Sequence, residues 1–129
     1  MPRGMAGLSW VMMKKEIERV EKPWGHELVW AKTGAYAGKI LHIKKVHKLS
    51  LQYHREKDES FLLHSGRMTF LFENEQGILE EAELKAGDAR HVPAGRRHRM
   101  IALEDCDVFE VSTPQLDDVV RLEDGYGRV

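Results

Sequence analysis

Four polar residues in this chain have the types and the spacing of metal ligands. Gln52 and His54 are separated by one residue, so on a β-strand both side chains point to the same face. Glu59 follows after four intervening residues, and His98 comes from a later segment. Imidazole, carboxylate and amide oxygen together suit a divalent metal such as Zn, Mn, Fe, Co or Ni. Three or four protein ligands leave coordination positions open for a substrate, which is typical of a catalytic site.

Short β segments separated by turn residues must position these side chains. Their spacing is typical of a β-sandwich or barrel, so the sequence predicts an all-β fold. The segments around a loop that ends at Gly77 predict a hairpin. Ahead of Pro23, residues 13–21 favour about two helical turns. The expected strands cover residues 26–31, 39–45, 49–53, 60–63, 67–72, 78–84, 89–92, 99–103 and 108–112.

The composition is that of one globular domain. The 129 residues are 42% hydrophobic and 32% charged, which argues against disorder. Twenty basic and 21 acidic residues give a net charge of -1, so no basic excess indicates nucleic acid or an anionic membrane. The single cysteine, Cys106, excludes an intramolecular disulfide, and no apolar run is long enough for a membrane span. We expect a cytoplasmic protein, and a homodimer because sheet edges often pair between copies.

Two spaced patterns resemble the paired motifs of the cupin superfamily. The first reads Q-x-H-x4-E-x6-G from Gln52, and the second reads G-x5-P-A-G-x2-H from Gly87 to His98. The glutamine in place of the first histidine, within the sequence L-S-L-Q, is similar to the phosphomannose isomerase branch. Residues 22–26, K-P-W-G-H, resemble the R-P-W-G entry of that family, and residues 117–128 closely resemble the end of its type II domain.

The resemblance implies a double-stranded β-helix, the jelly-roll-like cupin barrel. Residues 22–129 would form this single domain after an extension of residues 1–21 with a short helix. Its mouth would hold a divalent metal, zinc being the first choice, on Gln52, His54, Glu59 and His98. The family activity is the reversible aldose–ketose isomerisation of mannose 6-phosphate and fructose 6-phosphate, so the expected small-molecule partner is a phosphosugar. Polarisation of the C1 and C2 oxygens would acidify the adjacent C–H bond, and a nearby base would move the proton.

Four further residues are candidates for phosphate binding and proton transfer. Arg99 follows the last ligand, as an arginine does in the family, and Arg121 lies in the C-terminal match. Lys44 corresponds to a family lysine that would meet the phosphate, and Glu56 would act as acid or base. Each residue also has a purely structural interpretation, as a surface charge or a salt-bridge partner.

The chain departs from the family pattern near these positions. Glu56 replaces a histidine, and Ser60 and Phe61 replace a histidine and a tryptophan. Ala102 replaces an asparagine, and Val46 occupies the place of the glycine that opens the first motif. These changes leave the metal ligands intact but leave open the sugar and the group that moves the proton.

Three functions are therefore compatible with the sequence. The first is a metal-dependent sugar-phosphate isomerase in sugar-nucleotide or polysaccharide supply. The second is an oxygenase, in which iron with two open positions would bind oxygen and cleave a small substrate. The third is a non-catalytic cupin that binds sugar or metal and partners a separately encoded sugar-nucleotide pyrophosphorylase. Metal identity separates the first two, because zinc is redox-inert, and turnover separates both from the third.

Overall fold

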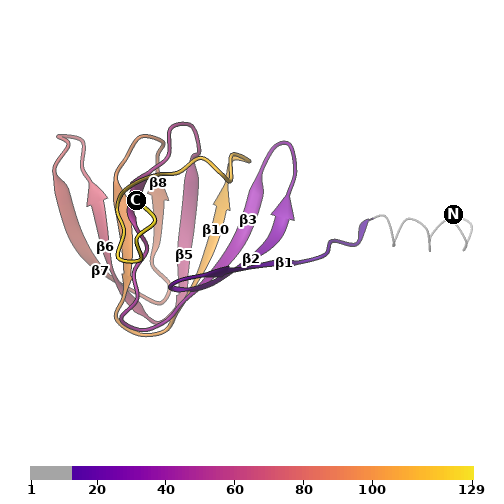
Figure 1. Cartoon of the computed structure of the whole chain (residues 1–129), viewed down its shortest axis with the longest axis horizontal. Helices are drawn as coiled ribbons and strands as arrows, with labels where there is room; N and C mark the ends of the chain where they lie inside the picture. Colours follow the sequence, from indigo (N-terminus) through magenta and orange to yellow (C-terminus); the bar gives the residue numbers. More distant parts are fainter. Residues whose placement is uncertain (1–12) are drawn as a thin grey trace, which may run out of the picture.

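Two antiparallel sheets make up the fold in the computed structural model, which describes residues 13–129. One sheet has six strands in the order β1-β2-β3-β10-β5-β8, and the other has five in the order β11-β4-β9-β6-β7. Figure 1 shows the C-terminal residues, in yellow, running back across the strands rather than away from them. The strands are β1 Glu18–Lys22, β2 Gly25–Lys32, β3 Ala37–Ile43, β4 Leu51–Tyr53, β5 Glu59–Ser65, β6 Arg67–Glu73, β7 Leu79–Lys85, β8 Ala89–Val92, β9 His98–Ala102, β10 Cys106–Ser112 and β11 Val120–Glu123.

The all-β prediction is confirmed, and each of the nine expected strands overlaps an observed one. The predicted hairpin is the β6–β7 pair, closed by the turn at residues 74–77. Two strands, β1 and β11, were not expected from the sequence. Both are short and rich in charged or half-buried residues, so neither shows the clear alternation of apolar and polar side chains that marks a half-buried strand.

The predicted helical turns over residues 13–21 are wrong, because residues 14–17 form no regular secondary structure and the residues after them form a strand. Residues 18–22 form β1, which pairs antiparallel with β2 from Glu18 opposite Val29 to Lys22 opposite Gly25. The apolar residues Ile17 and Val20 are three apart, a spacing that suits a helix, but pairing with β2 supplies β1 with backbone hydrogen bonds. Residues 1–12 of the predicted extension lie outside the described residues.

The core lies between the two sheets and is built by strict alternation along the strands. In β5, Glu59, Phe61 and Leu63 are buried while the residues between them are exposed. In β10, Cys106, Val108 and Glu110 face inward in the same way. Most inward positions are apolar, so the two inward carboxyl groups stand out. They lie toward the end of the sheets where the candidate ligands gather, since Glu110 is opposite Phe61 in the β10–β5 pair.

Two tight turns need a left-handed backbone. Gly66, between β5 and β6, has φ 91°, and a Cβ there would collide with the backbone oxygen of Asp105. Val46, in the place of the family glycine, has φ 67° and is 78% exposed. A β-branched residue in this conformation is strained, because its Cβ approaches the following carbonyl oxygen.

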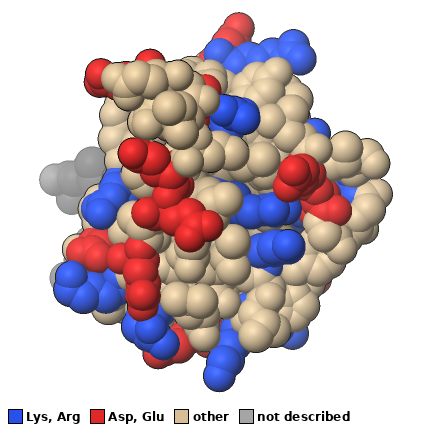
Figure 2. Space-filling model, turned by 90° about the vertical axis from the view of Figure 1, so that its left-hand side faces the viewer, with Lys and Arg blue, Asp and Glu red and all other residues tan. Residues whose placement is uncertain are grey.

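The outer surface carries mixed charges and one apolar row. On the side that carries β6 and β7, acidic and basic side chains are interspersed (Figure 2), as expected for a chain of nearly zero net charge. Across the outer face of the six-stranded sheet, Leu28, Ile40, Phe109 and Leu62 are neighbours in adjacent strands. The expected homodimer stays a prediction. Within residues 13–129, no helix is long and apolar enough to span a bilayer.

Candidate metal centre

The ligand candidates lie where three strands begin or end. His54 follows the last residue of β4, Glu59 is the first residue of β5, and His98 is the first residue of β9. Gln52 lies directly opposite His98 in the β4–β9 pair. The strands thus bring together residues that are up to 46 positions apart in the sequence. His54, Glu59 and His98 are each no more than 3% exposed.

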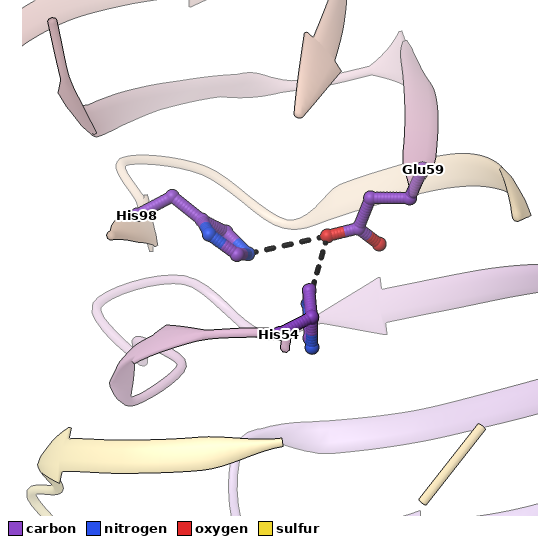
Figure 3. Close-up of side chains that lie close together, drawn as sticks. All are labelled: His54, Glu59 and His98. Atoms are coloured by element: carbon purple, nitrogen blue, oxygen red, sulfur yellow. Dashed lines mark hydrogen bonds and ion pairs between the residues drawn. The ribbon is translucent and has the colours of Figure 1, made fainter. Parts of the chain in front are cut away.

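Both histidines point their Nε2 atoms at the same carboxylate oxygen (Figure 3). The distance to Glu59 Oε1 is 3.1 Å from His54 Nε2 and 3.2 Å from His98 Nε2. On the other side of each ring, Nδ1 donates a hydrogen bond to a backbone carbonyl oxygen. His54 Nδ1 donates to Asp118 at 2.6 Å, and His98 Nδ1 donates to Arg96 at 3.0 Å. These carbonyl partners orient the rings and place the proton of the neutral imidazole on Nδ1.

This donor set fits a divalent cation. A neutral imidazole with its proton on Nδ1 has a bare lone pair on Nε2, so two lone pairs and a carboxylate oxygen converge. A cation placed between them would accept all three. Their ligand atoms all lie within 4.8 Å of one another, as one metal ion requires. The second oxygen, Glu59 Oε2, is buried without a hydrogen-bond partner among the described residues. The predicted fourth ligand, Gln52, lies beside this group, and its Oε1 accepts a hydrogen bond from Ser50 Oγ at 2.8 Å.

A buried lysine and a second buried carboxyl group lie next to Glu59. Lys57 Nζ lies 3.6 Å from Glu59 Oε2 and 3.8 Å from Glu110 Oε2. Burial raises the pKa of Glu110 well above its usual value, and the charge of Glu59 adds to this effect. Burial acts in the same direction on Glu59, but Glu110, His54, His98 and Lys57 together hold its pKa well below the usual value. Of the two carboxyl groups, Glu59 is therefore the one whose ionised form its surroundings favour.

A cavity of about 300 Å³ opens beside Gln52 and His54. Its wall carries buried groups of both signs, including the ion pair between Lys39 Nζ and Glu27 Oε2 at 3.1 Å. Burial lowers the pKa of Lys39, but the charges of Glu27 and Glu110 outweigh it and raise this pKa above its usual value. The C-terminal residues 116, 117, 119, 121 and 128 close the other side. The cavity is thus polar, charged and adjacent to two of the candidate ligands.

The four predicted catalytic residues lie in different surroundings. Arg121 lines the cavity, and its Nε is buried with no hydrogen-bond partner among the described residues. Arg99 is buried, but it donates to the backbone oxygens of Leu49 and Glu123, which ties β9 to β11. Lys44 and Glu56 are exposed and do not line the cavity. The structure therefore brings Arg121 to the site, and it gives Arg99 a structural role.

Several functional candidates were missed or undervalued in the sequence. Lys57 lies in a charged stretch of the sequence, yet it is buried beside Glu59. Glu27, Lys39 and Glu110 were not singled out. Their signal was present, because each is a charged residue at an inward position of an alternating strand. These residues could be recognised as buried only once it was known which face of each strand points into the core.

Several other aromatic and polar residues lie on the outer face or in the core. His64 is exposed on the outer face, where it stacks on Phe109. Phe61 and Phe70 are core residues. Burial raises the pKa of the Cys106 thiol to about 11, so this cysteine is a poor nucleophile.

Comparison with known proteins identifies relatives in polysaccharide and sugar-nucleotide biosynthesis. Residues 11–124 match the family described as mannose-6-phosphate isomerase, C-terminal. The alginate biosynthesis protein AlgA of Pseudomonas aeruginosa is 30% identical over 84% of this chain, which corresponds to 23% of that protein. The mannose-1-phosphate guanylyltransferase ManC of Salmonella typhimurium is 30% identical over 91% of this chain and 24% of the relative. The chain thus spans about a quarter of the length of these relatives.

Solved structures show the same fold at low sequence identity. Oxalate decarboxylase from Bacillus subtilis superimposes with a TM-score of 0.69 and 18% identity, covering 84% of this chain and 30% of that one. The capsular polysaccharide assembling protein CapF from Staphylococcus aureus gives a TM-score of 0.68 at 19% identity, over 84% of this chain and 35% of its own. From the fold, the site and the sequence match together, the chain is a cupin and belongs to the family of mannose-6-phosphate isomerase C-terminal domains.

Proposed function

We propose that this protein is a metal-dependent aldose–ketose isomerase that interconverts mannose 6-phosphate and fructose 6-phosphate. One observation carries the proposal: the His54–Glu59–His98 cluster adjoins a charged cavity lined by Arg121, a half-buried residue whose buried Nε has no hydrogen-bond partner among the described residues. The family match supports the same reaction. The names of the relatives support a place in the supply of sugars for polysaccharides.

The charged groups around the cavity have different roles in this proposal. Arg121 has no ion pair among residues 13–129, so its guanidinium is available for a phosphate group, which guanidinium binds with two parallel hydrogen bonds. A divalent cation on the three ligands would polarise the sugar oxygens at C1 and C2. The buried carboxyl groups of Glu27 and Glu110 face the same cavity and supply candidates for the group that moves the proton between the two carbons.

A second cavity, of about 400 Å³, borders His98 from the other side. Its wall includes the aromatic rings of Phe70 and Phe72. Two arginines of this wall are already paired with Glu73: Arg96 donates to its backbone oxygen, and Arg97 forms an ion pair with its carboxylate. The first cavity is the better phosphosugar site, because Arg121 is uncommitted there and buried acid–base groups line its wall.

The test is an interconversion assay on metal-stripped protein that is reloaded separately with Zn, Mn, Co, Ni and Fe(II). In deuterated water, isomerisation through proton transfer also labels C2 of the recovered mannose 6-phosphate. We expect metal-dependent turnover and labelling in the wild type, and loss of both in His98→Ala. The matched control is His64→Ala, which removes an exposed histidine on the outer face and should keep both activities.

A second candidate function is a non-catalytic sugar-binding module that partners a pyrophosphorylase. The guanylyltransferase name of one relative favours it. Calorimetric titration with mannose 6-phosphate, combined with the interconversion assay, separates the two proposals. Binding of metal and sugar without turnover or C2 labelling, with any of the five metals, would contradict the isomerase and support the module.

A further inference from the structure

Asp118, in the segment between β10 and β11, contacts the metal centre in two ways. Its backbone oxygen accepts the hydrogen bond from His54 Nδ1 at 2.6 Å. Its carboxylate accepts hydrogen bonds from three successive backbone N–H groups in the turn after His54. Oδ1 accepts from Arg55 at 3.0 Å, and Oδ2 accepts from Glu56 at 2.7 Å and from Lys57 at 2.9 Å. One residue thus holds both the ring of a ligand and the backbone that follows it.

Neighbouring contacts fasten the same segment to the barrel. Thr113 exchanges two hydrogen bonds with Asp58, since its N–H donates to the Asp58 backbone oxygen and its hydroxyl accepts from the Asp58 N–H, both at 3.0 Å. On the other side, Arg121 of β11 pairs with Gln52 of β4. The turn from His54 to Asp58 is therefore held between two strand ends, with Asp118 at its centre.

The turn held in this way carries two groups of the site besides His54. Lys57, whose N–H bonds to Asp118, points its ammonium group at Glu59. Glu59 begins β5 directly after the turn. Movement of the turn would therefore displace a ligand ring, the buried lysine and the start of the strand that carries the carboxylate ligand.

We propose that Asp118 is a positioning residue of the metal centre, which orients His54 through its backbone oxygen and fixes the 54–58 turn through its carboxylate. Partners that orient a metal-binding histidine typically change metal affinity by about 10- to 100-fold when they are lost. Here a side-chain substitution acts on the backbone contact indirectly, because loss of the three carboxylate bonds frees residue 118 to move away from His54.

The proposal concerns metal binding and does not depend on which sugar, if any, is turned over. Its test is the dissociation constant for Zn²⁺, measured by competition with a chromophoric chelator on metal-stripped protein. The Co²⁺ form adds a visible spectrum that reports the geometry of the ligands. The variants are Asp118→Ala and the milder Asp118→Asn, which keeps one acceptor oxygen and should fold if the alanine variant does not.

The matched control is Asp88→Ala. The Asp88 carboxylate also accepts a hydrogen bond from a backbone N–H, that of Lys85 at 2.9 Å, but in the turn between β7 and β8. β8 begins directly after this turn at Ala89, which lies opposite Leu62, whereas Glu59 lies opposite Val92 at the other end of the pairing. Loss of Asp88 thus reports the effect of removing a carboxylate that bonds to the backbone of a turn remote from the ligands.

We expect zinc affinity to fall about 10- to 100-fold in Asp118→Ala, with a smaller loss in Asp118→Asn and a changed Co²⁺ spectrum in both. Asp88→Ala should bind zinc as the wild type does. A purely structural role would lower the melting temperature of the metal-free protein without changing the dissociation constant. Zinc affinities of both Asp118 variants within twofold of the wild type, with unchanged Co²⁺ spectra, would overturn the proposal.

Discussion

Replacing Lys57 with methionine tests the electrostatics of the metal centre in the metal-free protein. Methionine keeps a long unbranched side chain and removes the charge. At 3.6 Å from Glu59 Oε2, with an effective dielectric constant of about 20, the lost Coulomb attraction is about 4–5 kcal/mol. The desolvation of Lys57 is recovered, so the net loss is smaller.

The expected cost is about 3 kcal/mol, at the lower end of what breaking a buried ion pair costs. In a domain of this size that lowers the melting temperature by roughly 10 °C, which scanning calorimetry of the metal-free protein measures. Saturating zinc should restore much of the loss, because the cation then compensates the Glu59 charge. The zinc-induced rise in melting temperature should therefore be larger in Lys57→Met than in the wild type.

The control is Lys85→Met, since Lys85 is exposed and its only ion pair among the described residues is with Asp88 at 3.6 Å. Exposed pairs contribute little, so this variant should melt with the wild type. A metal-free Lys57→Met protein that melts within about 2 °C of the wild type would refute the reasoning. An equal zinc-induced rise in both proteins would refute it as well.

Three further predictions follow from single residues. Val46→Gly should raise the free energy of unfolding, measured in urea, by about 1 kcal/mol, because glycine adopts the left-handed backbone of this exposed position without strain. An unchanged or lower free energy of unfolding would show that Val46 is not strained. Arg121→Gln should raise the KM for a phosphosugar about 10- to 100-fold and leave zinc affinity unchanged, and an unaltered KM would remove Arg121 from the phosphate site. Hydrogen bonds from Arg128 lower the pKa of Asp124 to about 2 from 3.8, so this carboxylate stabilises the fold above pH 3.8 and the contribution is lost as the pH falls toward 2. Urea unfolding of metal-free Asp124→Asn should show a weaker loss of stability over that range, and the same loss as in the wild type would refute this.

The sequence predicted the features that depend on local rules. Alternation of apolar and polar residues located the nine strands, and spacing and resemblance together picked out His54, Glu59 and His98. The segment of β1 was predicted to be helical, because the three-residue spacing of Ile17 and Val20 also suits a helix. Only pairing with β2 decides between the two.

Long-range contacts explain what the sequence could not show. The burial of Lys57 depends on two carboxyl groups that come from β5 and β10. The role of Asp118 depends on a carbonyl oxygen that reaches a histidine 64 positions away. No short pattern carries such information, because these contacts arise when distant strands meet.

The most direct test of the central claim is a crystal structure of the zinc-loaded protein with anomalous data collected at the zinc edge. We expect one strong anomalous peak per chain, within bonding distance of His54 Nε2, His98 Nε2 and Glu59, with both Nδ1 atoms still hydrogen-bonded to their backbone carbonyl oxygens. A zinc-loaded crystal with no peak at these three residues, or with its metal bound elsewhere, would contradict it.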